Sequence, residues 1–447
     1  MYTRTTSRKI HSSLTQASAI PTTLLFAALS FEISNSVHRN PDYTSGCNVR
    51  FEEPLKSDTA FFNQFIDGAS CLTDNFLQKG EEANPYDLQL PYIPVTGNVD
   101  DQLTAYFPEI VGPESIAVVE EKDLAYTGAD DGWIYKIDLL TMKAIKLATA
   151  CNATGVTECR PQGIRATSDN KLYFADSAGL CLYDIATDNV TVLVPRLSKV
   201  NGKAIMLPND LDVNEDTKMI YMSDSSTKYS NTNILRGTLL HDNHGRVLAY
   251  SIETNRVSVL VDGLSFPNGI QLSHDKKTLL VNEMNRRRIL QVTLDGASKG
   301  NYTVFTPSMP GEPDNIRAAS NNSYWVAINL ARNGSEKVLF DYLSNKACAT
   351  ENFVKMNNLV AEYLRLVAQT THRVDYIDVA DRLSSYEFVS EMASHQGSFL
   401  LIDADGKITK RYASNRFDFF SNPVEYKKQL LIGNDRNPYI VVVEGLV

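Results

Sequence analysis

A short phrase recurs along the chain: a proline, a polar residue, any residue, and then an aliphatic residue that opens an apolar run. Its copies start, in chain order, at Pro113, Pro161, Pro208, Pro267 and Pro313, with a weaker sixth copy at Pro423. The first five prolines follow one another at intervals of 46 to 59 residues, close to the repeat of about 40 to 50 residues in four-stranded propeller blades. The pattern therefore predicts one β unit that is repeated around a ring.

Two further strands follow each phrase. The second strands are apolar and cover residues 124–127, 172–176, 220–224, 279–283 and 324–328. The third strands alternate apolar and polar positions, as in residues 133–138 and 246–252. Six such units over residues 96–447 predict an all-β fold, a six-bladed β-propeller that closes on itself. A β-sandwich would not repeat one phrase at this period, and a βαβ fold would need amphipathic helices, which the sequence lacks before residue 335.

Helical spacing begins after the fifth copy of the phrase, in residues 336–343 and 353–367. The fifth and sixth copies are separated by more than two periods, which predicts a helical insertion over about residues 335–370, in the fifth-to-sixth blade region. Two interpretations of this insertion are open. It lies over one face of the propeller and caps the channel mouth, or it is a surface hairpin with no role in binding.

Residues 1–34 form an N-terminal hydrophobic segment. Arg4, Arg8 and Lys9 precede an apolar run over residues 17–29, and no acidic residue comes before Glu32. The run is short for a bilayer span, which needs about 20 apolar residues. A cleaved signal peptide and a single-pass anchor are therefore equally good interpretations, and an organelle transit peptide is the weakest. We expect a protein of the secretory pathway, secreted or anchored as a single-pass type II membrane protein. Residues 35–95 are an N-terminal extension without a recognisable motif.

Charge and cysteine content exclude two broad classes of protein. Among 447 residues, 43 Lys and Arg stand against 53 Asp and Glu, a net charge of -10, so no basic surface is available for nucleic acid. Six cysteines are too few for a disulfide scaffold. Five glycosylation sequons fit the secretory route but are also expected by chance in a chain this rich in Asn. They lie at Asn152, Asn189, Asn301, Asn321 and Asn333.

The repeated phrase also predicts a site. In a radial array the residues after each proline should converge on one axis, and they are Glu114, Gln162, Asn209, Asn268 and Asp314. All carry a carboxylate or amide oxygen and none carries sulfur, imidazole or ammonium, which suits a hard cation and favours Ca²⁺ over Mg²⁺. The alternative is that Pro-Asn and Pro-Asp are ordinary turn dipeptides that introduce strands.

Five phrases together resemble the strictosidine synthase-like family. They are residues 112–116, 159–165, 209–211 with 221–229, 266–270, and 309–317, and they occur in the family's order. The resemblance implies a six-bladed propeller, commonly with a type II membrane anchor, and hydrolysis of aryl esters or lactones in the animal members. In the wider superfamily of gluconolactonases and paraoxonases, the axial calcium ligands fall on Glu114, Asn209, Asn268 and Asp314.

The family resemblance also bears on the cysteines. It implies a disulfide between Cys151 and Cys159, because the family has one in the corresponding loop. Cys47 and Cys71 could form a second bridge. Cys181, on an apolar strand, and Cys348, in the insertion, are expected to be buried free thiols.

The resulting hypothesis is a calcium-dependent hydrolase whose partner is a small-molecule ester or lactone. A cation in a water-excluded channel would polarise the carbonyl without a serine nucleophile. The sequence shows no Gly-x-Ser-x-Gly elbow, no His-Glu-x-x-His helix and no recognisable histidine pair. We expect His241 and His244 to be solvated loop residues, and only Asp314 or Asp210 suggests itself as a proton acceptor.

Two other functions compete with hydrolysis. The first is a non-catalytic, calcium-stabilised propeller that binds a partner, in which the metal is structural. The second and weaker one is the condensation of an amine with an aldehyde, as in the plant synthases of the family, which use a glutamate near an acidic, His-containing phrase of the last blade. Here residues 420–429 lack that phrase, and Glu425 is expected to be a solvated residue at a strand edge.

Overall fold

The computed structural model describes residues 93–154, 159–332, 341, 347–384 and 395–447. The chain divides into two compact units. The larger unit contains the described residues from 93 to 341 and from 395 to 447, and it is a six-bladed β-propeller, as predicted. The smaller unit contains a pair of helices.

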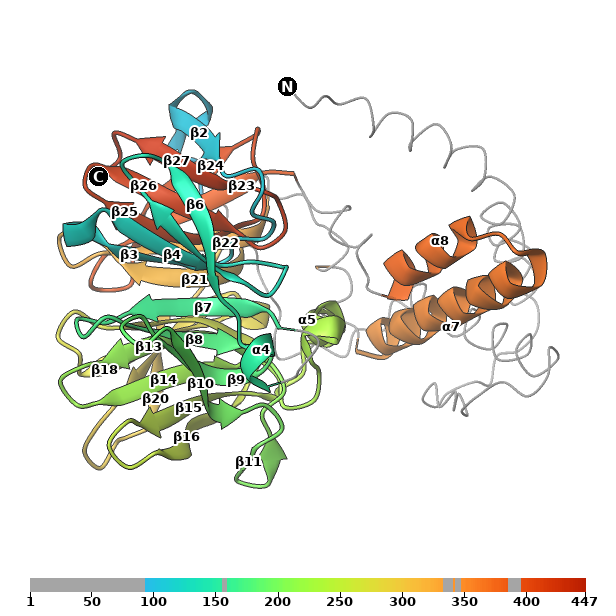
Figure 1. Ribbon diagram of the computed structural model, residues 1–447, viewed down its shortest axis with the longest axis horizontal. Coiled ribbons are helices and arrows are strands. Elements are labelled where there is room, and N and C mark those ends of the chain that lie inside the picture. The colour runs from blue at the N-terminus through green and yellow to red at the C-terminus, as the bar shows by residue number, and fades with distance from the viewer. Residues whose placement is uncertain (1–92, 155–158, 333–340, 342–346, 385–394) are drawn as a thin grey trace, which may run out of the picture. The chain divides into compact units, whose positions relative to one another are not determined.

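Six sheets form the blades, and they follow one another in chain order (Figure 1). The first three contain β3 (Ile116–Val119), β4 (Leu124–Gly128), β5 (Ile134–Asp138) and β6 (Lys143–Ala148); β7 (Pro161–Ala166), β8 (Lys171–Asp176), β9 (Gly179–Asp184) and β10 (Asn189–Pro195); and β13 (Pro208–Asn214), β14 (Met219–Asp224), β15 (Gly245–Ser251) and β16 (Arg256–Leu264). The last three contain β17 (Pro267–Leu272), β18 (Thr278–Glu283), β19 (Arg288–Thr293) and β20 (Tyr302–Thr306); β21 (Gly311–Ala318), β22 (Tyr324–Ala331), β23 (Gly397–Ile402) and β24 (Ile408–Ser414); and β25 (Phe420–Tyr426), β26 (Gln429–Asn434) and β27 (Ile440–Glu444).

The first strands of the blades surround the axis. Each contacts the first strand of the next blade, and β25 of the sixth blade contacts β3 of the first. Apolar residues fill the space between neighbouring blades. Between the third and fourth, for example, Tyr221 and Val247 belong to the same buried cluster as Leu279 and Leu290. The blades therefore hold one another in place by burial of apolar surface, and this packing fixes the residues that line the axis.

Two strands from the N-terminal part of the propeller complete the last two blades. Strand β2 (Leu103–Tyr106) pairs with β27 from Leu103 opposite Val443 to Tyr106 opposite Ile440, and it is the outer strand of the sixth blade. Strand β1 (Gly97–Asn98) pairs in parallel with β24. The ring is thus closed by hydrogen bonds between the two ends of the propeller sequence, which removes an open sheet edge.

The register of β25 corrects the sixth copy of the repeated phrase. In the third blade the pairing shifts between Pro208, opposite Asp224, and Leu211, opposite Met222. In the sixth blade the same shift lies between Phe420 and Pro423. Phe420 therefore holds the position of the repeated proline, and Pro423 holds the position of the aliphatic residue. The prediction that the sixth copy starts at Pro423 is wrong by three residues, because in this copy a phenylalanine replaces the proline at the first position.

The insertion is helical, as predicted, but it interrupts a blade. Helices α7 (Ala347–Thr371) and α8 (Asp375–Ser384) come between β22 and β23, the second and third strands of the fifth blade. They pack on each other through Ala361, Leu364 and Ala380, and Arg365 pairs with Asp381 at 2.9 Å. Most of the helical pattern predicted over residues 336–343 lies outside the described residues.

Short elements complete the described chain. They are α4 (Cys151–Thr154), α5 (Ile234–Leu240), the hairpin of β11 (Lys199–Val200) and β12 (Lys203–Ala204), and the 3-10 turns η1 (Asp100–Gln102), η2 (Glu120–Lys122), η3 (Asn231–Asn233) and η4 (Met284–Arg286). The N-terminal hydrophobic segment, Cys47 and Cys71 lie outside the described residues. Within the described ranges, none of the helices has the length and apolar character that a bilayer span requires.

Candidate functional site

Six side chains, one from the start of each blade, form what we call the cavity ring. Its members are Glu114, Gln162, Asn209, Asn268, Asp314 and Ser421. The first five line one cavity of about 380 Å³, and all six are buried. The structure therefore brings together the four predicted metal ligands, Glu114, Asn209, Asn268 and Asp314. The repeated phrase places them there because it occupies the same position in every blade.

Three oxygens of the cavity ring are buried without a hydrogen-bond partner among the described residues: Oδ1 of Asn209, of Asn268 and of Asp314. The other oxygen of Asp314 accepts a hydrogen bond from Asn329 Nδ2 at 2.9 Å, and Asn268 Nδ2 lies 3.5 Å from Met284 Sδ. An unsatisfied buried oxygen costs about 1–3 kcal/mol. Three such oxygens in one cavity indicate a ligand that is coordinated by oxygen atoms, and a hard cation has that chemistry.

Both carboxyl groups of the cavity ring, Glu114 and Asp314, have raised pKa values. Burial, opposed by Arg160 and aided by Asp435, raises the pKa of Glu114 to about 7. Burial and the neighbouring Glu114 raise the pKa of Asp314 well above its usual value. A bound divalent cation would reverse both effects by favouring the ionised forms. In the part of the chain that the structure describes, no three His, Cys, Asp or Glu side chains could hold a metal ion by themselves, so a cation here would depend on the amide oxygens of Asn209 and Asn268.

The charges around the cavity favour the same kind of ion. Four carboxylates and two guanidinium groups line it, belonging to Glu114, Asp130, Asp314, Asp435, Arg160 and Arg436. When all six are ionised, the lining carries a formal charge of two negative units. A divalent cation would neutralise this charge.

The wall of the cavity has a charged side and an apolar side. Asp130, Arg160, Asp435 and Arg436 come from loops of the first, second and sixth blades. The apolar side is formed by Ile234 at the start of α5, together with Phe266, Met284 and Leu330 from the fourth and fifth blades. Helix α5 belongs to the long connection between β14 and β15 (Figure 1). The cavity can therefore hold a molecule that has an apolar group at one end and a polar group at the other.

Arg160 connects the charged side of the cavity. Its Nη2 lies 3.4 Å from Glu114 Oε2 and donates to the main-chain oxygen of Asp435 at 3.2 Å. Its Nε lies 2.9 Å from Asp130 Oδ1. The preceding residue, Cys159, forms a disulfide with Cys151. This confirms the predicted pairing and places a covalent link directly beside Arg160.

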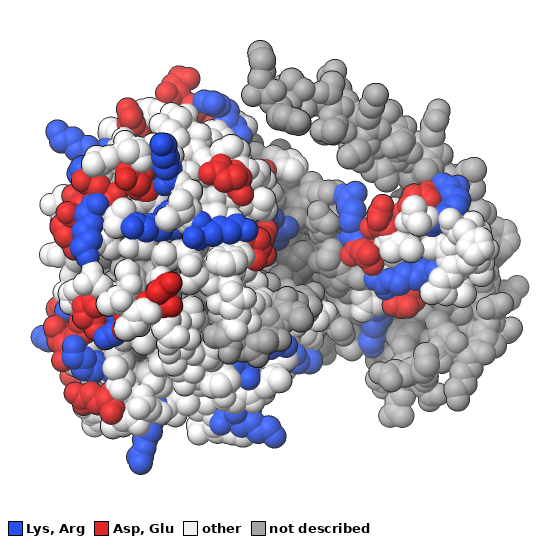
Figure 2. Space-filling model, in the orientation of Figure 1, with Lys and Arg blue, Asp and Glu red and all other residues white. Residues whose placement is uncertain are grey.

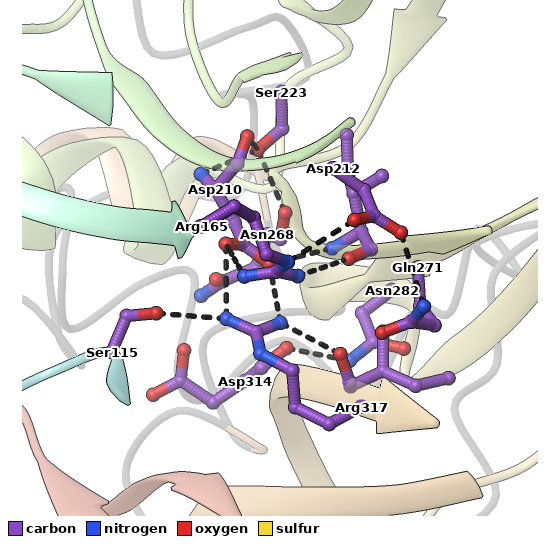
Figure 3. A network of polar contacts seen from close by, with 12 residues as sticks. Ser115, Arg165, Asp210, Asp212, Ser223, Asn268, Gln271, Asn282, Asp314 and Arg317 are labelled. Atoms are coloured by element: carbon purple, nitrogen blue, oxygen red, sulfur yellow. Dashed lines mark hydrogen bonds and ion pairs between the residues drawn. The ribbon is translucent and has the colours of Figure 1, made fainter. Parts of the chain in front are cut away.

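Beside the cavity ring, on the same innermost strands, lies a second group of polar residues, which we call the axial plug: Arg165, Asp210, Asp212 and Arg317 (Figure 3). Arg317 Nη1 and Nη2 bind the two oxygens of Asp210 at 2.8 and 3.1 Å. Arg165 lies 3.4 Å from Asp210 and 3.2 Å from Asp212. Burial alone would raise the pKa of Asp210, but the two guanidinium groups outweigh it and hold that pKa below its usual value. Both oxygens of Asp210 are thus engaged, and Asp210 is a poor proton acceptor, contrary to one of the two expectations.

The structure tests the expectations for three other side chains. His241 is partly buried, and burial followed by the nearby Arg287 lowers its pKa to about 4, so the prediction of a solvated residue is wrong for it. His244 is exposed, as predicted. Glu425 lies on β25 at the edge of its sheet, as predicted, but it is half-buried and accepts hydrogen bonds from Ser320 N at 3.1 Å and Trp325 Nε1 at 2.7 Å.

Several residues around the cavity were missed from the sequence. Asp130, Asp435 and Arg436 stand in loops between second and third strands, where the phrase does not repeat. Ser421 was missed because the sixth phrase begins with Phe420. Of the free thiols expected, Cys181 is buried as predicted.

On the face that it shows, Figure 2 has Lys and Arg interspersed with Asp and Glu on the propeller. Neither sign of charge forms a large continuous patch there.

Comparisons with known proteins agree with the fold. The family model for strictosidine synthase matches residues 209–296. The adipocyte plasma membrane-associated protein of Salmo salar is 39% identical over 244 residues, which cover 53% of this chain and 58% of that protein. The Gallus gallus protein of the same name is 33% identical over 337 residues, 74% of this chain and 75% of the relative. Strictosidine synthase-like 13 of Arabidopsis thaliana is 31% identical over 313 residues, 67% of this chain and 73% of the relative.

One solved structure supports the architecture. It is described as a gluconolactonase from Xanthomonas campestris and is 14% identical to this chain, with a TM-score of 0.50 over 82% of this chain and 99% of its own. At this identity the likeness concerns the fold alone.

Proposed function

The chain belongs to the strictosidine synthase-like family, and we propose that it is a calcium-dependent hydrolase of aryl esters or lactones. One observation carries the proposal: the buried, unpartnered oxygens of Asn209, Asn268 and Asp314 gather in one cavity. Glu114 supplies a second carboxylate to the same place. Two carboxylates and two amide oxygens are a donor set that suits Ca²⁺ and leaves positions for water or a substrate oxygen.

The chain's own residues would divide the work between binding and orientation. Glu114, Asn209, Asn268 and Asp314 would hold the cation, which when bound supplies Lewis acidity toward a carbonyl oxygen. The apolar side of the cavity, including Phe266 and Leu330, would take the aryl or alkyl group of the substrate and exclude water from it. Arg160 would keep Glu114 in place through their 3.4 Å contact.

Family relatives support the setting in the cell. Several are named plasma membrane-associated proteins. Together with the basic N-terminus and the apolar run that follows it, this supports a protein of the secretory pathway, secreted or anchored as a single-pass type II protein. The Cys151–Cys159 disulfide fits an oxidising compartment.

The test is hydrolysis of phenyl acetate and of a panel of lactones by the purified full-length chain, with calcium and with excess chelator. We expect chelation, Asp314→Ala and Asn268→Ala each to lower turnover at least about 100-fold, the size of effect seen when an oxyanion-stabilising group is removed. Asn255→Ala, in the exposed turn between β15 and β16, is the control for an Asn truncation and should leave turnover unchanged.

Thermal unfolding of the same samples separates the hydrolase from its competitor. Calcium at 100 times its Kd should stabilise the wild-type chain by about 2.7 kcal/mol, and Asn268→Ala should abolish that gain. Calcium stabilisation without any turnover would contradict the hydrolase and favour the calcium-stabilised binding propeller. A condensing enzyme of the plant type receives no support, because Glu425 is engaged by Ser320 and Trp325.

A further inference from the structure

Hydrolysis without a serine nucleophile needs a group that takes a proton from water. Such a group must line the cavity and keep a lone pair available. No histidine of the described chain lines the cavity. The candidate proton acceptors are therefore the four carboxylates of the lining: Glu114, Asp130, Asp314 and Asp435.

Three of these carboxylates are otherwise engaged. Glu114 and Asp314 belong to the proposed cation site. The side chain of Asp130 is 43% exposed and lies 2.9 Å from Arg160 Nε, so it is held as an ion pair at the solvent side. Of the two carboxylates outside the proposed cation site, Asp130 and Asp435, only Asp435 has a buried oxygen, Oδ1, without a hydrogen-bond partner in the described part of the chain.

The geometry of Asp435 leaves one oxygen free and fixes the other. Its Oδ2 lies 3.2 Å from Arg436 Nε. The loop that carries it is held by Asn434, whose Oδ1 accepts hydrogen bonds from the main-chain N of Arg436 at 3.0 Å and of Asn437 at 2.7 Å. The carboxylate is thus held in one orientation, as a proton acceptor must be.

Arg160 ties this loop to the cation site. It donates to the main-chain oxygen of Asp435 at 3.2 Å and lies 3.4 Å from Glu114 Oε2. The position of Asp435 relative to the cavity ring is therefore set by one guanidinium group from another blade. The charged groups that act on this region are Glu114, Asp130, Asp314, Arg160 and Arg436.

We infer that Asp435 is the proton acceptor of the hydrolysis, an inference that rests on the proposed function. Asp435 Oδ1 takes one proton from a water molecule while the oxygen of that water forms a bond to the carbonyl carbon of the ester or lactone. The bond from that carbon to the leaving oxygen then breaks, and the proton on Asp435 passes to the leaving oxygen. An ester gives a carboxylic acid and an alcohol or phenol, a lactone gives a single hydroxy acid, and Asp435 returns to its ionised form.

The test compares Asp435→Asn with Asp418→Asn in the full-length chain. Asp418 is the matched control because it belongs to the same blade, has a side chain 20% exposed against 21% for Asp435, and binds Asn437 of the same loop at 2.8 Å, but does not line the cavity. We expect Asp435→Asn to lower kcat about 100-fold to 10,000-fold with KM changed less than about 3-fold. Calcium affinity by isothermal titration calorimetry should be unchanged. Formate should raise the activity of Asp435→Ala at least about 10-fold, because a small carboxylate can replace the missing one.

Several results would overturn the inference while the proposed function stands. These are near-normal kcat in Asp435→Asn, an equal loss in Asp418→Asn, no rescue by formate, or a loss of calcium affinity as large as that of Asp314→Asn, which would make Asp435 a ligand. A wild-type chain that binds calcium but hydrolyses none of the esters and lactones would overturn both proposals.

Discussion

The channel axis contains two polar layers built from the same innermost strands. They differ in whether their buried carboxylate and amide oxygens have partners. In the axial plug, both oxygens of Asp210 bind Arg317, and Arg165 adds a further contact. In the cavity ring, the neighbouring residue Asn209 keeps an unpartnered oxygen, as does Asp314. Adjacent positions of one strand therefore serve different purposes.

The difference teaches where stability and binding capacity are located. A layer whose carboxylates are paired, as Asp210 is, stabilises the strands and has no free carboxylate oxygen for a cation, although Arg317 Nε is buried without a partner among the described residues. An unsaturated layer costs folding free energy and regains it when a ligand binds. We expect substitutions in the plug to lower the free energy of unfolding, and substitutions in the ring to lower the affinity for calcium.

The largest effect should come from breaking the plug. Arg317→Ala leaves the carboxylate of Asp210, which is fully buried, without its main partner, and the loss of one partner of a buried ion pair costs about 3–5 kcal/mol. Urea unfolding in the absence of calcium measures this loss of stability. Asn268→Ala, in the ring, should change stability by less than about 1 kcal/mol under the same conditions. Equal losses in the two variants would refute the division into two layers.

The same contrast recurs outside the axis, at the ends of the second strands. Asp224 ends β14 and pairs with Arg246, opposite to it on β15, at 2.9 Å. Asp176 ends β8 in the same way, but the residue opposite is Gly179. One oxygen of Asp176 is therefore buried without a partner among the described residues. Burial raises the pKa of both carboxyls, Asp176 and Asp224, to about 6, so the two differ in their partner and not in their pKa.

An intermediate effect should come from Asp176→Asn. Because the folded chain binds this proton more tightly than the unfolded chain, the wild-type protein loses stability as the pH rises from about 4 to about 6. The variant escapes this loss and should be more stable at pH 7.5, on the order of 2 kcal/mol, and similar to the wild type near pH 4. Urea unfolding at both pH values measures the difference. Asp224→Asn is the control and should be destabilised, because it leaves Arg246 without its carboxylate.

The smallest effect should come from Ser421→Ala, which sharpens the comparison within the cavity ring itself. Ser421 holds a ring position, but its hydroxyl already donates to the main-chain oxygen of Glu114 at 2.6 Å. We expect a loss of about 1 kcal/mol of stability, typical of one hydrogen bond, and an unchanged calcium affinity by calorimetry. A large fall in affinity would mean that partnered ring oxygens also reach the ion.

The sequence predicted the parts of the molecule that repeat. Five blades and five ring residues follow from one phrase. In four of these blades the same local pairing shift follows the proline, and in the first blade β3 pairs only from Ile116 onward. The family resemblance then narrowed the ring to Glu114, Asn209, Asn268 and Asp314. The start of the sixth blade was predicted at the wrong residue because Phe420 replaces the proline.

The rest of the site depends on contacts between distant parts of the chain. Arg317 meets Asp210 across 107 residues, and Arg160 meets the Asp435 loop across 275 residues. Neither contact leaves a periodic signal, because each is made once. The partner of a buried charge is set by the closed ring, and it becomes visible only when the blades are assembled.

Ring closure by β2 also has a consequence for the order of folding. The outer strand of the sixth blade is made early in synthesis, yet its partner β27 is more than 300 residues away. Until Ile440–Glu444 has left the ribosome, Leu103–Tyr106 has no strand to pair with and remains an unpaired edge. Contacts of such long range slow folding and prolong exposure to aggregation. The nascent chain should therefore depend on chaperones until its last blade is complete.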